Sequence, residues 1–195
     1  MKRIIYSLLV VLTAMSCDVD VEDTSPNSYA EFMSEGWILF SQTYYDSSYQ
    51  TFVDAIKKYP DSADVYTGAG WALMKMDSLN KAGQTFTTGS TKVGKDVDFY
   101  AGWSFCENAR RQFSSSNEKL MTALSLKPTW SFPYAGNIGA SDLKAMKAEN
   151  YFMMGDFVSS LAAVQVLDPN FTADIQSDVG IGELAVKIEA LKKAN

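Results

Sequence analysis

A repeat with a period of about 34 residues restricts the possible folds of this chain more than any other feature. Three segments align without a gap, and the step from the first to the second equals the step from the second to the third. Each segment has a small residue, a large residue four positions later, a small residue three beyond that, and a proline or glycine five further on. The segments are Ser48-x3-Phe52-x2-Ala55-x4-Pro60, Ala82-x3-Phe86-x2-Gly89-x4-Gly94 and Ser116-x3-Leu120-x2-Ala123-x4-Pro128. Such a repeat is typical of proteins built from stacked structural units.

A glycine followed by a tryptophan recurs upstream of each segment. The pairs are Gly36-Trp37, Gly70-Trp71 and Gly102-Trp103. The step from the first pair to the second equals the period of the repeat, but the next step is two residues shorter. We therefore expect a longer turn between the two halves of the third unit, near residues 110–116.

The spacing within each segment predicts a helix that packs closely on another helix. A small residue and a large residue four positions later lie on the same helical face, and the small residue allows a close approach. Pro60 and Pro128 are expected to end the second helix of their units, because proline cannot continue a helix. Each unit is therefore predicted to be a helix, a turn and a second helix.

This arrangement, in which a helix, a turn, a second helix and a helix-ending residue recur every 34 residues or so, resembles the tetratricopeptide repeat. The second unit matches that family's pattern best, through Tyr66, Ala69-Gly70, Leu73, Ala82, Phe86 and Gly89. The first unit departs from the pattern at Glu35 and Leu39, and the second has Gly94 where proline is usual. The resemblance implies an all-α fold, a right-handed superhelix of antiparallel helix hairpins.

We expect three such units, a degenerate fourth unit and a helix that caps the stack. The predicted boundaries are 29–62, 63–96, 97–128 and 129–169 for the units and 170–195 for the capping segment. In the fourth unit, helices are expected at about 141–154, with Ser141 as N-cap, and at 157–167. The small–large spacing is not recognisable there. The capping helix is expected at 181–193, where apolar and charged residues alternate at helical spacing.

The first sixteen residues have the composition of an export signal. Lys2 and Arg3 precede an apolar run from residue 4 to residue 14, which is too short to span a bilayer. The following Ala14-Met15-Ser16-Cys17 resembles the box that ends the signals of bacterial lipoproteins, in which the cysteine becomes the lipidated N-terminus. The alternative is cleavage at the same bond by an ordinary signal peptidase, which leaves Cys17 free.

This resemblance predicts a location in the bacterial cell envelope, with acyl chains on Cys17 anchoring the protein to the inner or outer membrane. Residues 17–28 are then a lipidated acidic tether, since they are polar, carry several carboxylates and include a proline. The membrane partner is reached through the lipid and not through charge, because the chain is acidic.

Composition argues against several functional classes. Removal of Lys2 and Arg3 with the signal changes the formal net charge from −6 to −8, which disfavours nucleic acid as a partner. The chain has no histidine, so it lacks the commonest general base and metal ligand. We expect no catalytic residues, no metal and no cofactor. Cys106 is expected to be a buried, inert thiol in the first helix of the third unit.

The three tryptophans are the candidates for a binding surface. The resemblance implies that the first helices line a concave face, which in this family binds an extended peptide or a partner's helix. A stripe of groove residues is expected there, formed by Trp37, Trp71 and Trp103 with Phe40, Met74 and Tyr100. The alternative is that the indoles pack as core between neighbouring repeats.

The sequence thus predicts a membrane-anchored scaffold for protein–protein interaction in the bacterial envelope, with a peptide or protein partner in the concave groove. The alternative function is a carrier that closes an aromatic-lined interior around a small apolar or glycan ligand. Aromatic residues make up 13% of the chain and suit either role. An enzyme is the least favoured class.

Overall fold

The computed structural model describes residues 28–193. The predicted signal, Cys17 and nearly all of the predicted tether therefore lie outside the described residues. Within residues 28–193 the structure is all-α, with nine helices and no β-strand, as the sequence predicts. The helices are α1 (Tyr29–Ser41), α2 (Tyr45–Lys58), α3 (Ala63–Lys75), α4 (Leu79–Gly89), α5 (Val97–Ala109), α6 (Phe113–Leu126), α7 (Ala140–Met153), α8 (Phe157–Leu167) and α9 (Asp178–Lys193).

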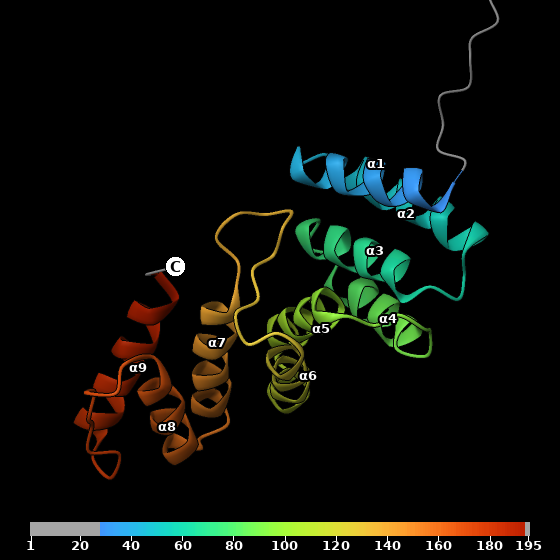
Figure 1. Cartoon of the computed structure of the whole chain (residues 1–195). Helices are drawn as coiled ribbons and strands as arrows, with labels where there is room; N and C mark the ends of the chain where they lie inside the picture. The colour runs from blue at the N-terminus through green and yellow to red at the C-terminus, as the bar shows by residue number, and fades with distance from the viewer. Residues whose placement is uncertain (1–27, 194–195) are drawn as a thin grey trace, which may run out of the picture.

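Consecutive helices form four hairpins that stack into a solenoid, and α9 covers the last hairpin (Figure 1). The first helices of neighbouring hairpins are also in contact, so α1, α3, α5, α7 and α9 form one continuous row. No helix of the described residues is both long enough and apolar enough to cross a membrane. The stack has to be held by side-chain packing between neighbouring helices.

The four hairpins share one turn geometry. Each turn has three residues, and its middle residue has a positive φ: 67° at Thr43, 56° at Asp77, 61° at Arg111 and 77° at Gly155. The expected longer turn near residues 110–116 is therefore wrong, because the third turn has the same length as the others. The two-residue discrepancy has a different origin, which the contacts between the paired helices reveal.

Hydrogen bonds between the helices of a hairpin define which residues are equivalent. In three hairpins, a serine hydroxyl of the second helix donates to the carbonyl twelve residues earlier. The bonds run from Ser48 to Gly36 (2.8 Å), from Ser116 to Ser104 (2.9 Å) and from Ser160 to Ala148 (2.8 Å). The third-unit equivalent of Gly36 is therefore Ser104 and not Gly102. Gly102 is instead equivalent to Gly68, since each lies against the previous hairpin.

The large residue four positions after each small one fills the centre of its hairpin. Phe52, Phe86, Leu120 and Val164 are fully buried at these positions. The expectation that the fourth unit loses the small–large spacing is therefore wrong, because Ser160 and Val164 retain it. The pattern is hidden in the sequence because the step from Ser116 to Ser160 is ten residues longer than the period of the repeat.

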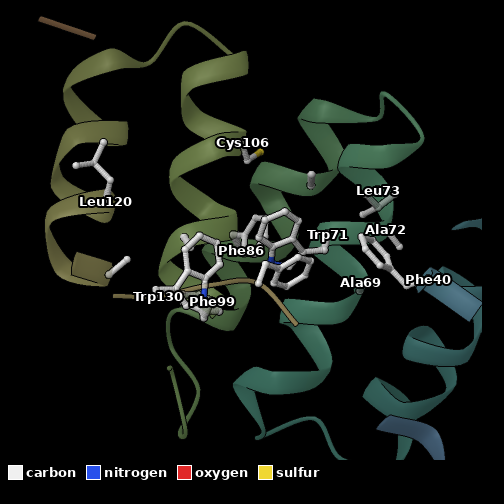
Figure 2. Close-up of a cluster of buried hydrophobic side chains, with 14 of the residues drawn as sticks. Phe40, Ala69, Trp71, Ala72, Leu73, Phe86, Phe99, Cys106, Leu120 and Trp130 are labelled. Carbon is white, nitrogen blue, oxygen red and sulfur yellow. The ribbon is translucent and has the colours of Figure 1, made fainter. Parts of the chain in front are cut away.

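Three hydrophobic clusters stabilise the described part of the stack, and the smallest of them lies between α1, α2 and α3. The larger of the other two runs through the first three hairpins, includes Trp130 and Phe132 from the segment before α7, and reaches α7 itself. Figure 2 shows Trp71 and Phe86 close together in this cluster, with Phe99 and Trp130 beside them. The smaller one joins α7, α8 and α9. It includes Leu184 and Ile188, which α9 buries as a capping helix would.

Two predicted helix starts need correction. The last helix, α9, begins at Asp178, three residues before the expected start. The N-cap of α7 is Gly139 and not Ser141, because the Asp142 carboxylate accepts a hydrogen bond from the Gly139 backbone N–H at 2.7 Å. A carboxylate in the first turn can satisfy an N–H that no intrahelical carbonyl reaches. The helix therefore begins at Ala140, one residue before the predicted position.

Candidate functional site

The connection between α6 and α7, residues 127–139, is much longer than the corresponding connections after α2 and α4. The step from Arg111 to Gly155 exceeds the step from Asp77 to Arg111 by ten, and six of these ten residues lie in the connection, because it has 13 residues where the connection after α4 has seven. Its ends are joined by hydrogen bonds from the Phe132 N–H to the Ile138 carbonyl and from the Ala140 N–H to the Trp130 carbonyl. We call residues 127–139 the aromatic loop. Figure 1 shows it reaching the end of α3 before it returns to α7.

The aromatic loop covers the tryptophans of the first two hairpins. Tyr134 stacks on Trp37 with ring centroids 4.1 Å apart and an interplanar angle of 3°. Phe132 stacks on Trp71 at 4.1 Å and 16°. The Ser41 hydroxyl also donates to the Tyr134 carbonyl at 3.2 Å. The face that the sequence predicts as an open groove is therefore partly filled by the chain's own side chains.

Asp98 fastens the base of the aromatic loop. Its carboxylate accepts a hydrogen bond of 2.6 Å from the Trp130 indole, and its backbone carbonyl accepts one of 3.0 Å from the Trp71 indole. Burial raises the pKa of Asp98, and the hydrogen bond from Trp130 opposes this shift. Asp98 thus joins the loop and α3 to the start of α5.

An open hollow of about 710 Å³ remains beside the loop. It is lined by α1, which contributes Met33, Trp37 and Ile38, and by Tyr134 and Asp64. The Ile38 side chain is 48% exposed. We call this hollow the α1 groove.

The polar end of the α1 groove is acidic. The Tyr29 hydroxyl donates to Asp64 Oδ2 at 2.8 Å, and burial raises the pKa of Tyr29. A smaller adjoining hollow of about 150 Å³ is lined by Asp64, Asp96 and Asp98. None of these three carboxylates forms an ion pair within the described residues. The groove therefore combines an apolar wall with a negative floor.

Solved structures with this architecture are recognisable at low sequence identity. A tetratricopeptide repeat protein from Parabacteroides merdae ATCC 43184 superposes with a TM-score of 0.57 at 12% identity, over 85% of this chain and 60% of that one. A crystal structure of MamA gives a TM-score of 0.60 at 14% identity, over 85% of each chain. The fold is a tetratricopeptide-like solenoid. This chain spans about 60% of the length of the Parabacteroides protein. No protein-family model and no curated protein matches the sequence.

Three of the four predicted groove residues of the first two hairpins occupy buried positions. Trp37, Phe40 and Trp71 are 6%, 2% and 2% exposed. Trp37 is the only one of these three that lines the α1 groove. Phe40 and Trp71 pack as core, which agrees with the alternative interpretation of the aromatic residues. Phe132 stacks on Trp71 and lies edge-on to Trp37 and Phe40 in this aromatic interior.

The remaining predicted groove residues lie elsewhere. Met74 and Tyr100 are half-buried against the larger hydrophobic cluster. Trp103 is not equivalent to Trp37 and Trp71, because the inter-helix hydrogen bonds assign that position to Phe105. Trp103 packs instead within its own hairpin, where the Lys119 ammonium lies 4.4 Å from the ring centroid. The expected stripe of three equivalent tryptophans is therefore wrong at its third position.

The described residues contain no group of three or more His, Cys, Asp or Glu side chains placed to hold a metal ion. Cys106 is fully buried, as the sequence predicts. Burial, and to a smaller extent the neighbouring Glu107, raises the pKa of its thiol to about 12, whereas Arg110 opposes the shift. Since only the thiolate is strongly nucleophilic, this cysteine is unsuited to covalent catalysis near neutral pH.

Sequence reasoning missed Phe132 and Tyr134 as components of this face. A signal is present, because Trp130, Phe132 and Tyr134 alternate with other residues at every second position. Such alternation places aromatic side chains on one side of an extended segment. The intervening Pro133 hides this signal, because proline is typical of a loop.

Proposed function

We propose that this protein is a scaffold that binds a segment of a partner protein in the α1 groove. The supporting observation is the half-exposed Ile38 in an open hollow whose other wall, Tyr134, is fixed by stacking on Trp37. A rigid, preformed surface binds with little loss of conformational freedom. The tetratricopeptide-like fold supports protein–protein interaction as the general role.

The chemistry of the groove suggests the character of the partner segment. Met33 and Ile38 offer apolar contact, and Asp64 supplies a carboxylate at the inner end. A segment with an apolar side chain near a lysine or arginine would match both features. The formal net charge of −6 favours a basic partner over an acidic one.

We also propose that the scaffold is anchored to a membrane of the bacterial envelope through acyl chains on Cys17. The support is the basic, apolar and small-residue pattern of residues 1–16 directly before that cysteine. Anchoring confines the groove to the membrane surface and raises its effective concentration toward membrane-bound partners.

A site-specific photocrosslinker tests the groove. Ile38 is 48% exposed on α1 and Met121 is 51% exposed on α6, so they form a matched pair of surface positions. With the full chain in its own host envelope, crosslinking from position 38 should give a defined protein adduct that position 121 does not give. Ile38→Asp should abolish partner binding, whereas Met121→Asp should leave it intact. The same adducts at both positions, or none at position 38, would contradict the proposal.

Surface substitutions are needed because Trp37 and Trp71 are almost fully buried. Their replacement by alanine would remove core packing at a cost of about 3–5 kcal/mol each, and lost binding would then only report unfolding.

The anchor is tested separately. The wild-type chain should incorporate an alkynyl fatty acid and sediment with membranes, and Cys17→Ser should do neither. An unlabelled wild-type chain would refute the lipid anchor. It would leave the groove proposal standing, since the crosslinking result does not depend on the anchor.

A further inference from the structure

The last described helix, α9, occupies the position of the first helix of a fifth hairpin. Gly182 follows Ala148 by one period of the repeat, and Gly180 precedes it by two positions, as Gly68 precedes Gly70. Gly180 lies against the backbone of Asp174 in the connection before α9, and Gly180 and Leu184 are buried in α9 as Gly68 and Ala72 are in α3. In the described residues no second helix packs on α9 from its open side.

The open side of α9 presents Gly182 to open space, and we call the gap left by its missing side chain the notch. A β-carbon added to Gly36 or Gly70 would lie 2.6 Å or 2.5 Å from the ring of Phe52 or Phe86, whereas one added to Gly182 would meet nothing within 4 Å. Val179 and Val186 flank Gly182 and are 74% and 72% exposed.

The equivalents of these two valines in α1 are Met33, which is half-buried, and Phe40, which is 2% exposed. The open side of α9 is therefore a helix-packing surface that has no helix on it among the described residues. We call Val179, Gly182, Glu183 and Val186 the α9 socket.

We propose that the α9 socket binds an amphipathic helix of a partner protein, one that carries a small residue followed four positions later by a large apolar one. The chain itself shows what fits such a surface, because its four second helices present this pair to their first helices. The pairs are Ser48 and Phe52, Ala82 and Phe86, Ser116 and Leu120, and Ser160 and Val164.

Charge adds a second requirement for the partner helix. Glu183 stands where the first two hairpins have Trp37 and Trp71, beside the position of the incoming large residue. It is exposed and forms no ion pair in the described part of the chain. A lysine or arginine near the large residue of the partner helix would complement this carboxylate.

A second copy of this chain is a poorer occupant of the socket. Two α9 helices in antiparallel contact at Gly182 would bring each Glu183 close to the Glu183 of the other copy, which is repulsive. The face also has no large side chain that could enter the opposite notch, since it offers only Val179 and Val186 around the glycine.

The probe is a stapled helical peptide with the sequence of residues 45–58, which contains Ser48 and Phe52. A second peptide has lysines in place of the two aspartates. Both are titrated against the full chain and followed by fluorescence anisotropy. Both should bind, and the lysine peptide should bind about tenfold more tightly at low salt because of the acidic surface.

Gly182→Leu fills the notch without a clash, so the thermal midpoint should be retained while peptide affinity falls at least about tenfold. Ala162→Leu, on the exposed face of α8, is the matched control and should leave affinity unchanged. Glu183→Gln should remove most of the preference for the lysine peptide.

Three results would overturn the proposal: no binding by the wild-type chain, equal binding by Gly182→Leu, or self-association that Gly182→Leu abolishes. The last result would assign the socket to a second copy. Ile38→Asp should not affect peptide binding, so failure of the α1 groove and failure of the α9 socket are distinguishable.

Discussion

Phe52 lies between two glycines, and this arrangement allows a sharp test of the packing. A β-carbon added to Gly68 of α3 would lie under 3.0 Å from three atoms of the Phe52 ring, and Gly36 of α1 approaches the same ring end from the other side. Phe52 is 0% exposed, so its ring has no space into which it can move. We predict that Gly68→Ala destabilises the protein.

Two opposing effects set the magnitude. Alanine is favoured over glycine within a helix by about 1 kcal/mol. Overpacking a filled core costs about 1–3 kcal/mol, and the three close ring atoms place Gly68→Ala near the upper end. The expected net loss is about 1–2 kcal/mol, which corresponds to a fall of roughly 2–8 °C in the thermal midpoint of a chain of this size.

Urea and thermal unfolding of the full chain measure the effect. Gly182→Ala is the matched control, because its added methyl group meets open space, and it should stabilise the protein by up to about 1 kcal/mol. Phe52→Leu should cost less in the Gly68→Ala background than in the wild type, since the shorter side chain relieves the clash. If Gly68→Ala stabilises the protein as much as Gly182→Ala does, the Phe52 ring has room to move, and the described packing of α1 and α3 against this ring is wrong.

Three further predictions concern the core and the aromatic loop. Cys106, whose thiol pKa is raised to about 12, should resist a thiol reagent at pH 8 in the native protein and react fully in urea; rapid native labelling would contradict its burial. Asp98→Asn should raise the thermal midpoint at pH 7, because burial raises the pKa of Asp98 and its charge therefore costs stability above that pKa. The gain should shrink as the pH falls through the raised pKa and vanish once the pH is below the ordinary pKa of an aspartate, and a gain that persists in acid would refute this cause. Phe132→Ala should lower the free energy of unfolding by about 3–5 kcal/mol in urea titrations, whereas the exposed Pro133→Ala should change it little; equal effects would show that the loop does not pack as described.

The helices could be predicted because the residues that specify them are local. Ser48, Phe52 and Pro60 lie within one helix and its end, so helical periodicity and proline chemistry locate the second helix of the unit without knowledge of distant contacts. The same reasoning gave the full extent of α8, residues 157–167.

The equivalence of the first helices could not be predicted as safely. Gly102-Trp103 imitates Gly70-Trp71, yet Gly102 is small because it faces Trp71 of the previous hairpin, whereas Gly70 is small because it faces Phe86 of its own. A glycine in the sequence does not reveal which neighbour needs the space. The hydrogen bond from Ser116 to Ser104 and the unchanged length of the third turn separate these two cases.

The candidate site was least predictable because it depends on contacts between distant segments. Trp37 and Tyr134 are far apart in the sequence, and nothing near either residue indicates that their rings stack. The sequence identified Trp37 as a candidate for the binding surface. The groove beside it exists only because the aromatic loop crosses to α1.

That crossing has a consequence for how the protein unfolds. In an ordinary solenoid each hairpin contacts only its neighbours, so the array melts progressively from its ends. Here the hydrogen bond from Ser41 to Tyr134 spans 93 residues and ties the first hairpin to the segment that leads into the fourth. The first hairpin cannot fray without breaking the stack on Trp37. The aromatic loop thus changes a linear array into a closed cooperative unit. The backbone amide hydrogens of the N-terminal hairpin should therefore exchange with solvent as slowly as those at the centre of the stack.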